Sequence, residues 1–301
     1  MGRSRSITGS RILITGASQG IGRALADAAA RQGALVLAAA RSTELLDDLA
    51  AQVQSRGGVL EVVAADVTRA DDRLALRDAA TRHFGGLDVL VNNAGIGATG
   101  HFAEASPDRL RKIMEVNFFG LTETTRVLLP LLRQGQKPAI VNISSIAGKR
   151  GIPARSEYSA SKFAVQGFSE ALRAELDKDG IDVLVVCPGL TQTSFSQNML
   201  EQKAKLQMDH LRGMTAEAVA QATLRALARG KSETCLSLQG KLLVFVSRFF
   251  PRLADRIAAK RVRELFPEEI AERRQRRASR QQAPSFLVNQ RDESLRSSGQ
   301  K

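Results

Sequence analysis

A tyrosine and a lysine in the segment YSASK form the first candidate for chemistry in this sequence. Tyr158 is the only tyrosine in the chain, and Lys162 follows four residues later. Residues 156–178 have the pattern of one helix, and residues four apart lie on the same helix face. A free tyrosine has a pKa of about 10, and a nearby ammonium lowers it by stabilising the phenolate. We therefore predict that Tyr158 is an acid/base group tuned by Lys162; the alternative is a solvated surface pair.

Three polar residues elsewhere favour chemistry at this pair. The segment NISSIAG leaves an apolar run and brings Ser144 and Ser145 to the edge of the predicted sheet. Either hydroxyl could donate to a substrate oxygen and stabilise the charge that develops there. Asn117 stands in a helical pattern beside two phenylalanines, which is an unusual place for a carboxamide. These residues indicate a proton-transfer site rather than a surface pair.

A glycine-rich turn, TGASQGIG (15–22), follows the first apolar run and begins a helical pattern. Glycines permit the tight bend and a close approach of the backbone to pyrophosphate, and the helix N-terminus presents free N–H groups. This context predicts a dinucleotide site whose contacts are Gly16, Ser18, Gln19, Gly20, Ile21 and Gly22.

The adenosine end of that site is indicated by two strand ends. Ala40 stands where an NAD-selective site usually has an acid, and Arg41 suits a ribose 2′-phosphate. NADP(H) is therefore favoured over NAD(H), although Arg41 could also be a surface arginine that begins the next helix. Asp66, followed by Val67, could accept a hydrogen bond from adenine or cap a helix near Thr68.

The turn NNAG (92–95) ends a further apolar run. Ligands of open α/β sheets bind at the carboxyl ends of the strands, so the turn predicts cofactor contacts at Asn93, Ala94 and Gly95. Asparagine also suits turn geometry alone, and that alternative remains open.

The elements that position these motifs alternate regularly. Apolar runs, separated by amphipathic stretches, cover 11–15, 34–40, 59–65, 87–93, 138–144, 181–187 and 234–239. Continuous apolar runs are typical of parallel strands buried on both faces, and the alternation indicates right-handed βαβ units. We predict an α/β fold: a single Rossmann-type, doubly wound parallel sheet of about seven strands flanked by helices. It covers residues 1–240 and is followed by a C-terminal helical extension.

Together these motifs resemble the classical short-chain dehydrogenase/reductase (SDR) family. The resemblance rests on TGxxxGxG (15–22), NNAG (92–95), a serine 13 positions before the tyrosine, YxxxK (158–162) and a PG turn (188–189), in this order. It covers about residues 10–240 and implies an oxidoreductase with NAD(P)(H) that forms homodimers or homotetramers.

The resemblance also implies roles for individual residues. Hydride passes between the nicotinamide and a carbonyl or carbinol carbon while Tyr158 transfers the proton. Lys162 would also bind the nicotinamide ribose, Ser145 rather than Ser144 would donate to the substrate oxygen, and Asn117 would hold a water that links Lys162 to solvent. The nicotinamide carboxamide would contact Pro188, Gly189, Thr191 and Thr193.

Composition limits the other classes of protein. Hydrophobic residues make up 43 % and charged residues 25 %, as in ordinary globular proteins. Two cysteines make no disulfide framework, and we find neither a signal-peptide core nor an apolar run long enough to span a bilayer. We expect a cytoplasmic protein, or one peripheral on the inner face of a membrane. The three histidines (His83, His101 and His210) lack ligand spacing, so no metal site is predicted; His101 could line the substrate pocket or lie on the surface.

Two segments bear on the substrate and partners. Residues 194–214 occupy the place of a substrate loop and could form a lid for an apolar substrate or pack ordinarily. Residues 241–266 carry an apolar stripe flanked by Arg248, Arg252 and Arg256, which suits either an anionic membrane surface or packing on protein. Residues 267–301 are expected to be a basic, disordered tail.

The function predicted from the sequence is an NADP(H)-dependent oxidoreductase that interconverts a carbonyl and a secondary alcohol on an apolar or lipid-like substrate. The alternative is a membrane-surface or scaffolding protein that binds NADP(H) without turnover. Specific nucleic-acid binding is not expected despite the net charge of +13, since no nucleic-acid module is recognisable and aromatic residues make up only 4 %.

Overall fold

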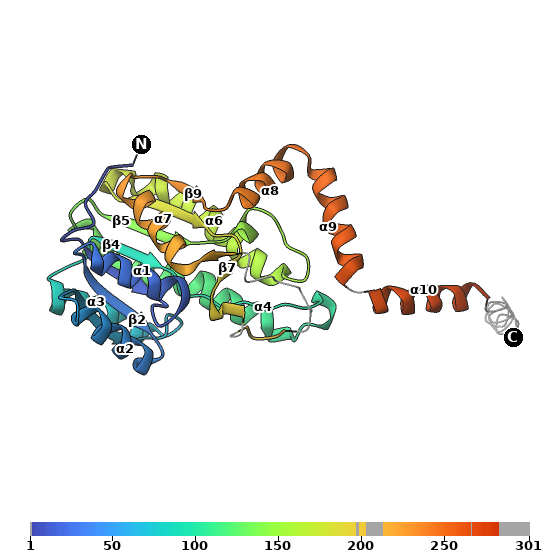
Figure 1. Cartoon of the computed structure of the whole chain (residues 1–301), viewed down its shortest axis with the longest axis horizontal. Coiled ribbons are helices and arrows are strands. Elements are labelled where there is room, and N and C mark those ends of the chain that lie inside the picture. The colour runs from blue at the N-terminus through green and yellow to red at the C-terminus, as the bar shows by residue number, and fades with distance from the viewer. Residues whose placement is uncertain (1, 197–198, 203–212, 266, 283–301) are drawn as a thin grey trace, which may run out of the picture. The chain divides into compact units, whose positions relative to one another are not determined.

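A computed structural model describes residues 2–196, 199–202, 213–265 and 267–282. Its centre is a seven-stranded parallel sheet in the order β3-β2-β1-β4-β5-β6-β9 (Figure 1). The strands are β1 (Arg11–Thr15), β2 (Leu35–Ala40), β3 (Val59–Ala64), β4 (Val89–Asn92), β5 (Ala139–Ile143), β6 (Asp182–Cys187) and β9 (Glu233–Cys235). This confirms the predicted α/β fold with a single doubly wound sheet.

Helices cover both faces of the sheet. One face packs against α1 (Gly20–Arg31), α2 (Thr43–Gln54) and α7 (Ala216–Ala228). The other packs against α3 (Ala70–Phe84), α5 (Gly120–Arg133) and α6 (Ser156–Leu176). Along β1, Ile12 and Ile14 belong to the first core and Leu13 to the second. Both faces are buried, which is why the strands read as continuous apolar runs rather than as alternating patterns.

The strand order reverses between β1 and β4. From β1 the chain builds β2 and β3 to one side, and from β4 it builds β5, β6 and β9 to the other. Neighbouring loops therefore leave the sheet in opposite directions and open a crevice at the carboxyl ends of the strands. The glycine-rich turn follows β1, the NNAG turn follows β4, and the Ser144–Ser145 segment follows β5, so this crevice collects the candidate motifs.

The helical pattern around Asn117 contains an irregular turn. α4 (Pro107–Met114) and α5 are joined by a π-helical turn, Glu115–Phe119, which contains Asn117. The strand expected at 234–239 ends at Cys235, because Ser237 caps the next helix by accepting a hydrogen bond from the Gly240 amide at 2.9 Å. Two short strands, β7 (Thr191–Gln192) and β8 (Met214–Thr215), pair in a second, two-stranded sheet.

The C-terminal region contains α8 (Leu238–Phe249), α9 (Pro251–Leu265) and α10 (Pro267–Gln282). The chain divides into two compact units, residues 1–255 and 256–301. The first unit therefore extends past residue 240, where we expected the domain to end, and includes all of α8. Leu243 and Val244 of α8 pack against Ile146, Val185 and Cys187, which joins this helix to the first unit.

The expected disordered tail is helical over residues 267–282. Proline at the first helical position, followed by glutamate, arginine, glutamine and alanine, favours this helix. Residues 283–301 lie outside the described part of the chain. No helix of that part is both long enough and apolar enough to cross a membrane.

Candidate active site

The glycine-rich turn is packed too tightly for side chains. Gly16 and Gly20 have φ of +65° and +57°, and a Cβ on Gly16 would lie 2.8 Å from Cα of Ala94. A Cβ on Gly22 would overlap the carbonyl oxygen of Gly16. Backbone N–H groups at the start of α1 are thereby brought to the crevice, as a pyrophosphate site requires.

Asn93 fastens the NNAG turn to the glycine-rich turn. Its side-chain amide donates to the carbonyl oxygens of Thr15 and Gly16, both at 3.0 Å. The Thr15 hydroxyl in turn accepts hydrogen bonds from the backbone amides of Asn93 and Ala94, at 3.1 and 3.2 Å. The predicted cofactor residue Asn93 therefore also sets the geometry of the turn, as the alternative interpretation held.

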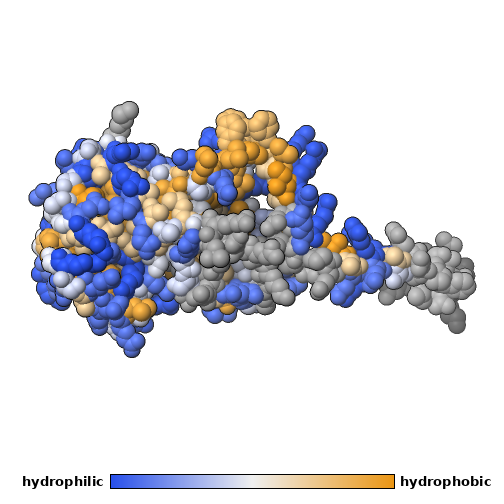
Figure 2. Space-filling view, viewed as in Figure 1, coloured by the Kyte–Doolittle hydropathy of each residue, from blue (hydrophilic) through white to orange (hydrophobic). Residues whose placement is uncertain are grey.

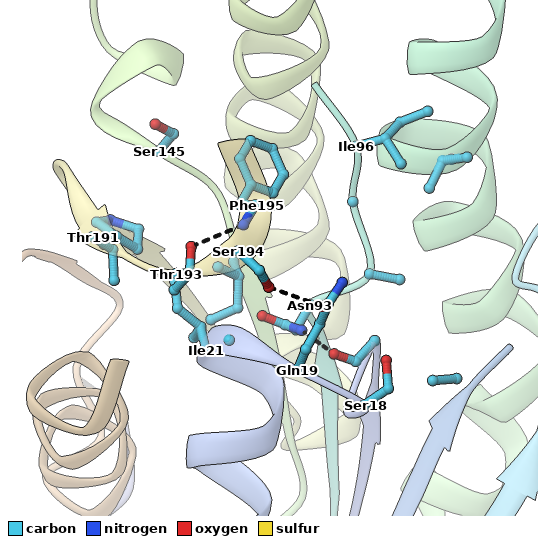
Figure 3. Close-up of a pocket in the computed structure, with 18 of the residues that line it drawn as sticks. Ser18, Gln19, Ile21, Asn93, Ile96, Ser145, Thr191, Thr193, Ser194 and Phe195 are labelled. Carbon is cyan, nitrogen blue, oxygen red and sulfur yellow. Dashed lines mark hydrogen bonds between the residues drawn. The ribbon is translucent and has the colours of Figure 1, made fainter. Parts of the chain in front are cut away.

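A cavity of about 360 Å³ lies along the carboxyl ends of the strands (Figure 3). Of the predicted residues, all but Gly22 and Asn117 line it: Gly16, Ser18, Gln19, Gly20, Ile21, Arg41, Asp66, Val67, Asn93, Ala94, Gly95, Ser145, Tyr158, Lys162, Pro188, Gly189, Thr191 and Thr193. At one point the two walls meet, where the Ser194 hydroxyl donates to Oε1 of Gln19 at 2.8 Å (Figure 3).

Arg41 and Asp66 line the same end of the cavity. One carboxylate oxygen of Asp66 accepts from the amide and the hydroxyl of Thr68, at 2.9 and 2.8 Å. Burial alone would raise the pKa of Asp66, but these hydrogen bonds and the charges of Arg41 and Arg69 outweigh it and lower the pKa. Helix α3 begins only at Ala70, so Asp66 closes the preceding turn rather than capping the helix.

Tyr158 lies in the first turn of α6 and is almost entirely buried, with 9 % of its surface exposed. Burial raises its pKa, while a hydrogen bond with Ser145 and the positive charge of Arg155 act in the opposite direction. The Ser144 hydroxyl instead donates to the carbonyl oxygen of Lys162 at 3.2 Å. Of the two candidate serines, Ser145 is thus the one that contacts the tyrosine.

Lys162 lies next to Tyr158, with Nζ 5.8 Å from the centre of the tyrosine ring. Nζ donates to the carbonyl oxygen of Ile143 at 2.9 Å. Burial lowers the pKa of Lys162 to about 8. We expected the Lys162 ammonium to lower the pKa of Tyr158, but the net direction at Tyr158 is upward because burial outweighs the Ser145 hydrogen bond and the charge of Arg155.

Asn117 sits behind the cavity wall and positions its surroundings. Its carboxamide oxygen accepts from the Ile96 amide at 2.8 Å, and its nitrogen donates to the Ile96 carbonyl and the Ser161 hydroxyl, both at 2.9 Å. A Cβ on Gly95 would lie 3.2 Å from the Asn117 oxygen and 3.6 Å from Lys162 Nζ. The side chain thus joins the NNAG loop to α6 beside Lys162.

Several lining residues escaped the sequence interpretation. Arg155 lies three residues before Tyr158, a spacing that would have pointed to it, and Phe195 has its ring centre 5.8 Å from that of Tyr158. The others are Ala39, Ser42, Leu45, Ala65, Ile96, Val116, Ile143, Leu190 and Ser194, while Ala40 and Ser144, both named from the sequence, also line the cavity. Most are apolar or small residues next to a predicted contact, where the sequence offers no distinct signal.

The histidines named from the sequence, and most of the predicted substrate loop, are not among the residues described as lining this cavity. His101 is not among the residues that line it, and His83 lies 3.5 Å from a carboxylate oxygen of Glu61. Among the described residues, no group of three or more histidine, cysteine, aspartate or glutamate side chains could hold a metal ion. His210 and most of the predicted substrate loop, residues 197–198 and 203–212, lie outside the described residues.

This fold and this site define an oxidoreductase domain of the nicotinamide-dinucleotide-binding class. The sequence model of the family "short chain dehydrogenase" matches residues 10–204. The chain belongs to this family, as the resemblance implied, and is an SDR enzyme of the kind that acts on CH–OH donors.

Individual relatives agree with the assignment. The chain is 34 % identical over 254 residues to the uncharacterized oxidoreductase YxnA of Bacillus subtilis, covering 83 % of this chain and 71 % of the relative. It is 34 % identical over 259 residues to the ketoacyl reductase HetN of Nostoc sp., covering 84 % and 89 %.

Solved structures with bound cofactor have the same fold. A short chain dehydrogenase/reductase from Burkholderia phymatum in complex with NAD has a TM-score of 0.76 at 27 % identity, covering 83 % of this chain and 96 % of that one. An alcohol dehydrogenase from the archaeon Thermococcus sibiricus, complexed with 5-hydroxy-NADP, has a TM-score of 0.68 at 26 % identity, covering 75 % and 95 %.

Proposed function

We propose that this protein is an NADP(H)-dependent oxidoreductase that interconverts a carbonyl and a secondary alcohol on an apolar or lipid-like substrate, with Tyr158 as the acid/base. The observation that carries the proposal is the juxtaposition of Ser145, Tyr158 and Lys162 in one cavity with the glycine-rich turn. A module that only binds a nucleotide has no use for a buried tyrosine and lysine beside it.

The cavity fits a dinucleotide. The backbone approaches closely at Gly16, where a Cβ would strike Ala94, and the turn offers N–H groups at the start of α1. The residues that would hold the cofactor are the lining residues of that turn, of the NNAG turn and of the Pro188–Thr193 segment. When bound, the nicotinamide supplies or accepts the hydride.

The proton step follows from the surroundings of Tyr158. Because burial raises its pKa, the phenol is protonated near neutrality and suits donation to a carbonyl oxygen that gains charge. Ser145 would donate a second hydrogen bond to that oxygen. After the proton leaves, the charge of Arg155 stabilises the phenolate. The free protein is therefore poised for the reductive direction.

Lys162 and Asn117 would complete the proton path. With a pKa of about 8, Lys162 exchanges its proton near physiological pH. The carboxamide of Asn117 is committed to Ile96 and Ser161, so a water that links Lys162 to solvent would be held by the backbone of the π-helical turn rather than by this side chain.

Mutation of Tyr158 tests this mechanism. Candidate carbonyls and alcohols are screened while NADPH absorbance is followed, and the active pair is then measured with Tyr158→Phe. General acid–base catalysis contributes about 10²–10⁴-fold, so turnover should fall by that factor while NADPH affinity stays unchanged. Turnover retained in the variant contradicts the mechanism. A protein that binds NADPH yet turns over no substrate supports the alternative of a binding or scaffolding role.

The preference for NADP(H) rests on Arg41, which lines the cavity at the end of β2 where no acid stands. A hydrogen bond to a charged group contributes about 1.5–3 kcal/mol, so Arg41→Ala should weaken NADPH binding about 10–150-fold and leave NADH binding nearly unchanged. The exposed Arg31→Ala on α1 is the matched control. An equal loss for both cofactors would refute the role of Arg41.

An apolar substrate is supported by the cavity wall and by α8. Ile96, Leu190 and Phe195 line the cavity that contains Tyr158. On α8, Leu238, Leu242, Phe245 and Phe249 are 84 %, 62 %, 54 % and 61 % exposed, and Figure 2 shows hydrophobic side chains gathered there. This outer face is flanked by Lys241 and Arg248, a combination that suits an anionic membrane surface. Peripheral association with the inner face of a membrane is therefore part of the proposed function.

Liposome flotation distinguishes the occupants of this face. The full chain should float with vesicles containing anionic phosphatidylglycerol and not with neutral phosphatidylcholine vesicles, and Phe245→Ser with Phe249→Ser should abolish flotation. Matched substitutions at the exposed Leu74 and Leu110 should leave flotation intact. If instead the α8 variants dissociate a homodimer or homotetramer in light scattering, without any flotation of the parent, the face is a subunit contact.

A further inference from the structure

The two cysteines are 48 residues apart in the sequence and lie in adjacent strands of the sheet. Cys187 ends β6 and Cys235 ends β9, and the two residues are in register in adjacent parallel strands. Cys187 is completely buried, Cys235 is half-buried, and both are free thiols. In-register neighbours point to the same face of a sheet, and both side chains pack in the same small cluster with Ile146.

The two thiols differ in reactivity. A hydrogen bond with Cys187 and the charges of Lys149 and Lys241 lower the pKa of Cys235 to about 7, against burial and Glu233. The hydrogen bond and burial raise the pKa of Cys187. Thiolates are the reactive form of cysteine, so Cys235 is the nucleophile and Cys187 the partner that stays protonated. Lys149 is held in place by Glu233, with Nζ 2.6 Å from its carboxylate.

We propose that Cys187 and Cys235 form a redox-active dithiol that hydroperoxides convert reversibly into a disulfide, and that this disulfide impairs the nicotinamide end of the cavity. The Cys235 thiolate attacks the terminal peroxide oxygen, the O–O bond breaks, and sulfenic acid forms as hydroxide leaves from hydrogen peroxide or alkoxide leaves from an organic hydroperoxide. The Cys187 thiol then attacks the sulfenic sulfur; the S–S bond forms and water leaves with the thiol proton. An added dithiol reverses the reaction by exchange.

The position of the pair explains why bridging would affect the site. Adjacent strands lie about 4.8 Å apart, which is within the Cα separation of about 4.4–6.8 Å found in disulfides, so the bridge can form. The Cβ atoms of a disulfide lie only about 3.8 Å apart, so bridging must tilt the two cysteine side chains toward each other and twist the strand ends that carry them. The next residue is Pro188, which lines the cavity and whose carbonyl accepts from the Ile146 amide at 2.9 Å. The strain therefore reaches both the Pro188–Gly189 turn and the segment that carries Ser145. A misplacement of about 1 Å can cost about 10²-fold in rate.

The groups that face the two sulfurs come from four elements. Gln166 of α6 has its carboxamide oxygen 3.9 Å from the Cys187 sulfur, and Glu233 of β9 has a carboxylate oxygen 4.0 Å from the Cys235 sulfur. Lys149 follows the Ser145 segment, and Lys241 belongs to α8. We therefore expect the rate of Cys235 oxidation to rise with pH around pH 7. For an ordinary thiol, whose pKa is about 8.5, the same rise would occur at a higher pH.

The test is peroxide oxidation of the full chain, followed by alkylation, proteolysis and mass spectrometry. We expect an intramolecular Cys187–Cys235 cross-linked peptide that dithiothreitol removes. Cys187→Ser should stop at a sulfenic acid on Cys235 that dimedone traps, and Cys235→Ser should not react. Over-oxidation of Cys235 without a cross-link, or a cross-link between two chains, overturns the proposal. This readout needs no substrate, so it stands apart from failure of the proposed function.

The effect on the site is measured with the same samples. Oxidation should weaken NADPH binding, followed by cofactor fluorescence, at least about tenfold, and dithiothreitol should restore it. Peroxide should leave NADPH binding by Cys187→Ser unchanged, since that variant cannot form the bridge. A disulfide that forms without any change in NADPH affinity refutes the coupling between the dithiol and the nicotinamide turn.

Discussion

The buried ammonium of Lys162 should lower the free energy of unfolding, although the side chain belongs to the proposed active site. Burial lowers its pKa from 10.5 to about 8, so the folded state disfavours the ammonium. The difference between these values corresponds to about 3 kcal/mol. Below about pH 8 both the folded and the unfolded chain carry the charge, and the cost is present in full. Between about 8 and 10.5 the unfolded chain binds more protons, so stability rises with pH, and above that range the cost is gone.

Lys162→Met isolates this effect. Methionine keeps much of the chain length without the charge, and the loss of the hydrogen bond to the Ile143 carbonyl does not depend on pH. The free energy of unfolding of the parent, minus that of the variant, should rise by about 2 kcal/mol between about pH 7 and about pH 9.5. Urea denaturation of both proteins at several pH values measures it. Tyr158 stays protonated in the folded state over this range because burial raises its pKa.

The control is the exposed Lys178→Met in the turn after α6, which removes a lysine without removing a buried ammonium. A difference between the parent and Lys162→Met that does not change with pH would refute the reasoning, because it would mean that water reaches the Lys162 ammonium in the folded state. Activity is a separate readout: the variant should lose turnover even where its stability exceeds that of the parent.

Three further outcomes follow from the packing around the site. Arg109→Met should lower the free energy of unfolding by about 3–5 kcal/mol. Arg109 is 1 % exposed and donates to Glu157, whose buried carboxylate would lose its charged partner. Urea denaturation measures this loss, and an unchanged midpoint would contradict it. Gly22→Ala should weaken NADPH binding in fluorescence titration, since its Cβ would press on the Gly16 carbonyl; unchanged affinity would show that the turn can shift freely. Ser145→Ala should reduce kcat about 10²–10³-fold in steady-state assays, as loss of a transition-state donor does, whereas Ser144→Ala should act on stability; the reverse order would exchange the two serines.

The fold could be predicted from the sequence because parallel strands buried on both faces have an unmistakable pattern. Each of the first six apolar runs contains a strand of the sheet. The seventh was overextended, because a serine at 237 looks like any strand residue until its hydroxyl is seen capping α8. The right-handed crossover rule fixes the hand of each βαβ unit, but the strand order, and with it the point of reversal where the motifs meet, is seen only in the structure.

The site was predictable where a motif fixes residue types, and not where geometry decides. Spacing predicted that Tyr158 and Lys162 lie together, and both line the cavity. No spacing states that Asn117 lies in a π-helical turn with its side chain bound to Ile96. Residues such as Phe195 contact Tyr158 through a loop whose path no local pattern specifies.

Burial explains the pKa shifts of Tyr158 and Lys162, which could not be predicted from the sequence. The sequence suggested that Lys162 acts on Tyr158 by charge, which would lower the pKa of the tyrosine. In the folded chain the same burial raises the pKa of Tyr158 and lowers that of Lys162, so both groups are driven toward their neutral forms. A neutral phenol is an acid, which is what carbonyl reduction needs. A lysine with a pKa of about 8 can return the proton near physiological pH. Desolvation therefore supports the proposed role of the pair in proton donation without any contribution from a bound cofactor.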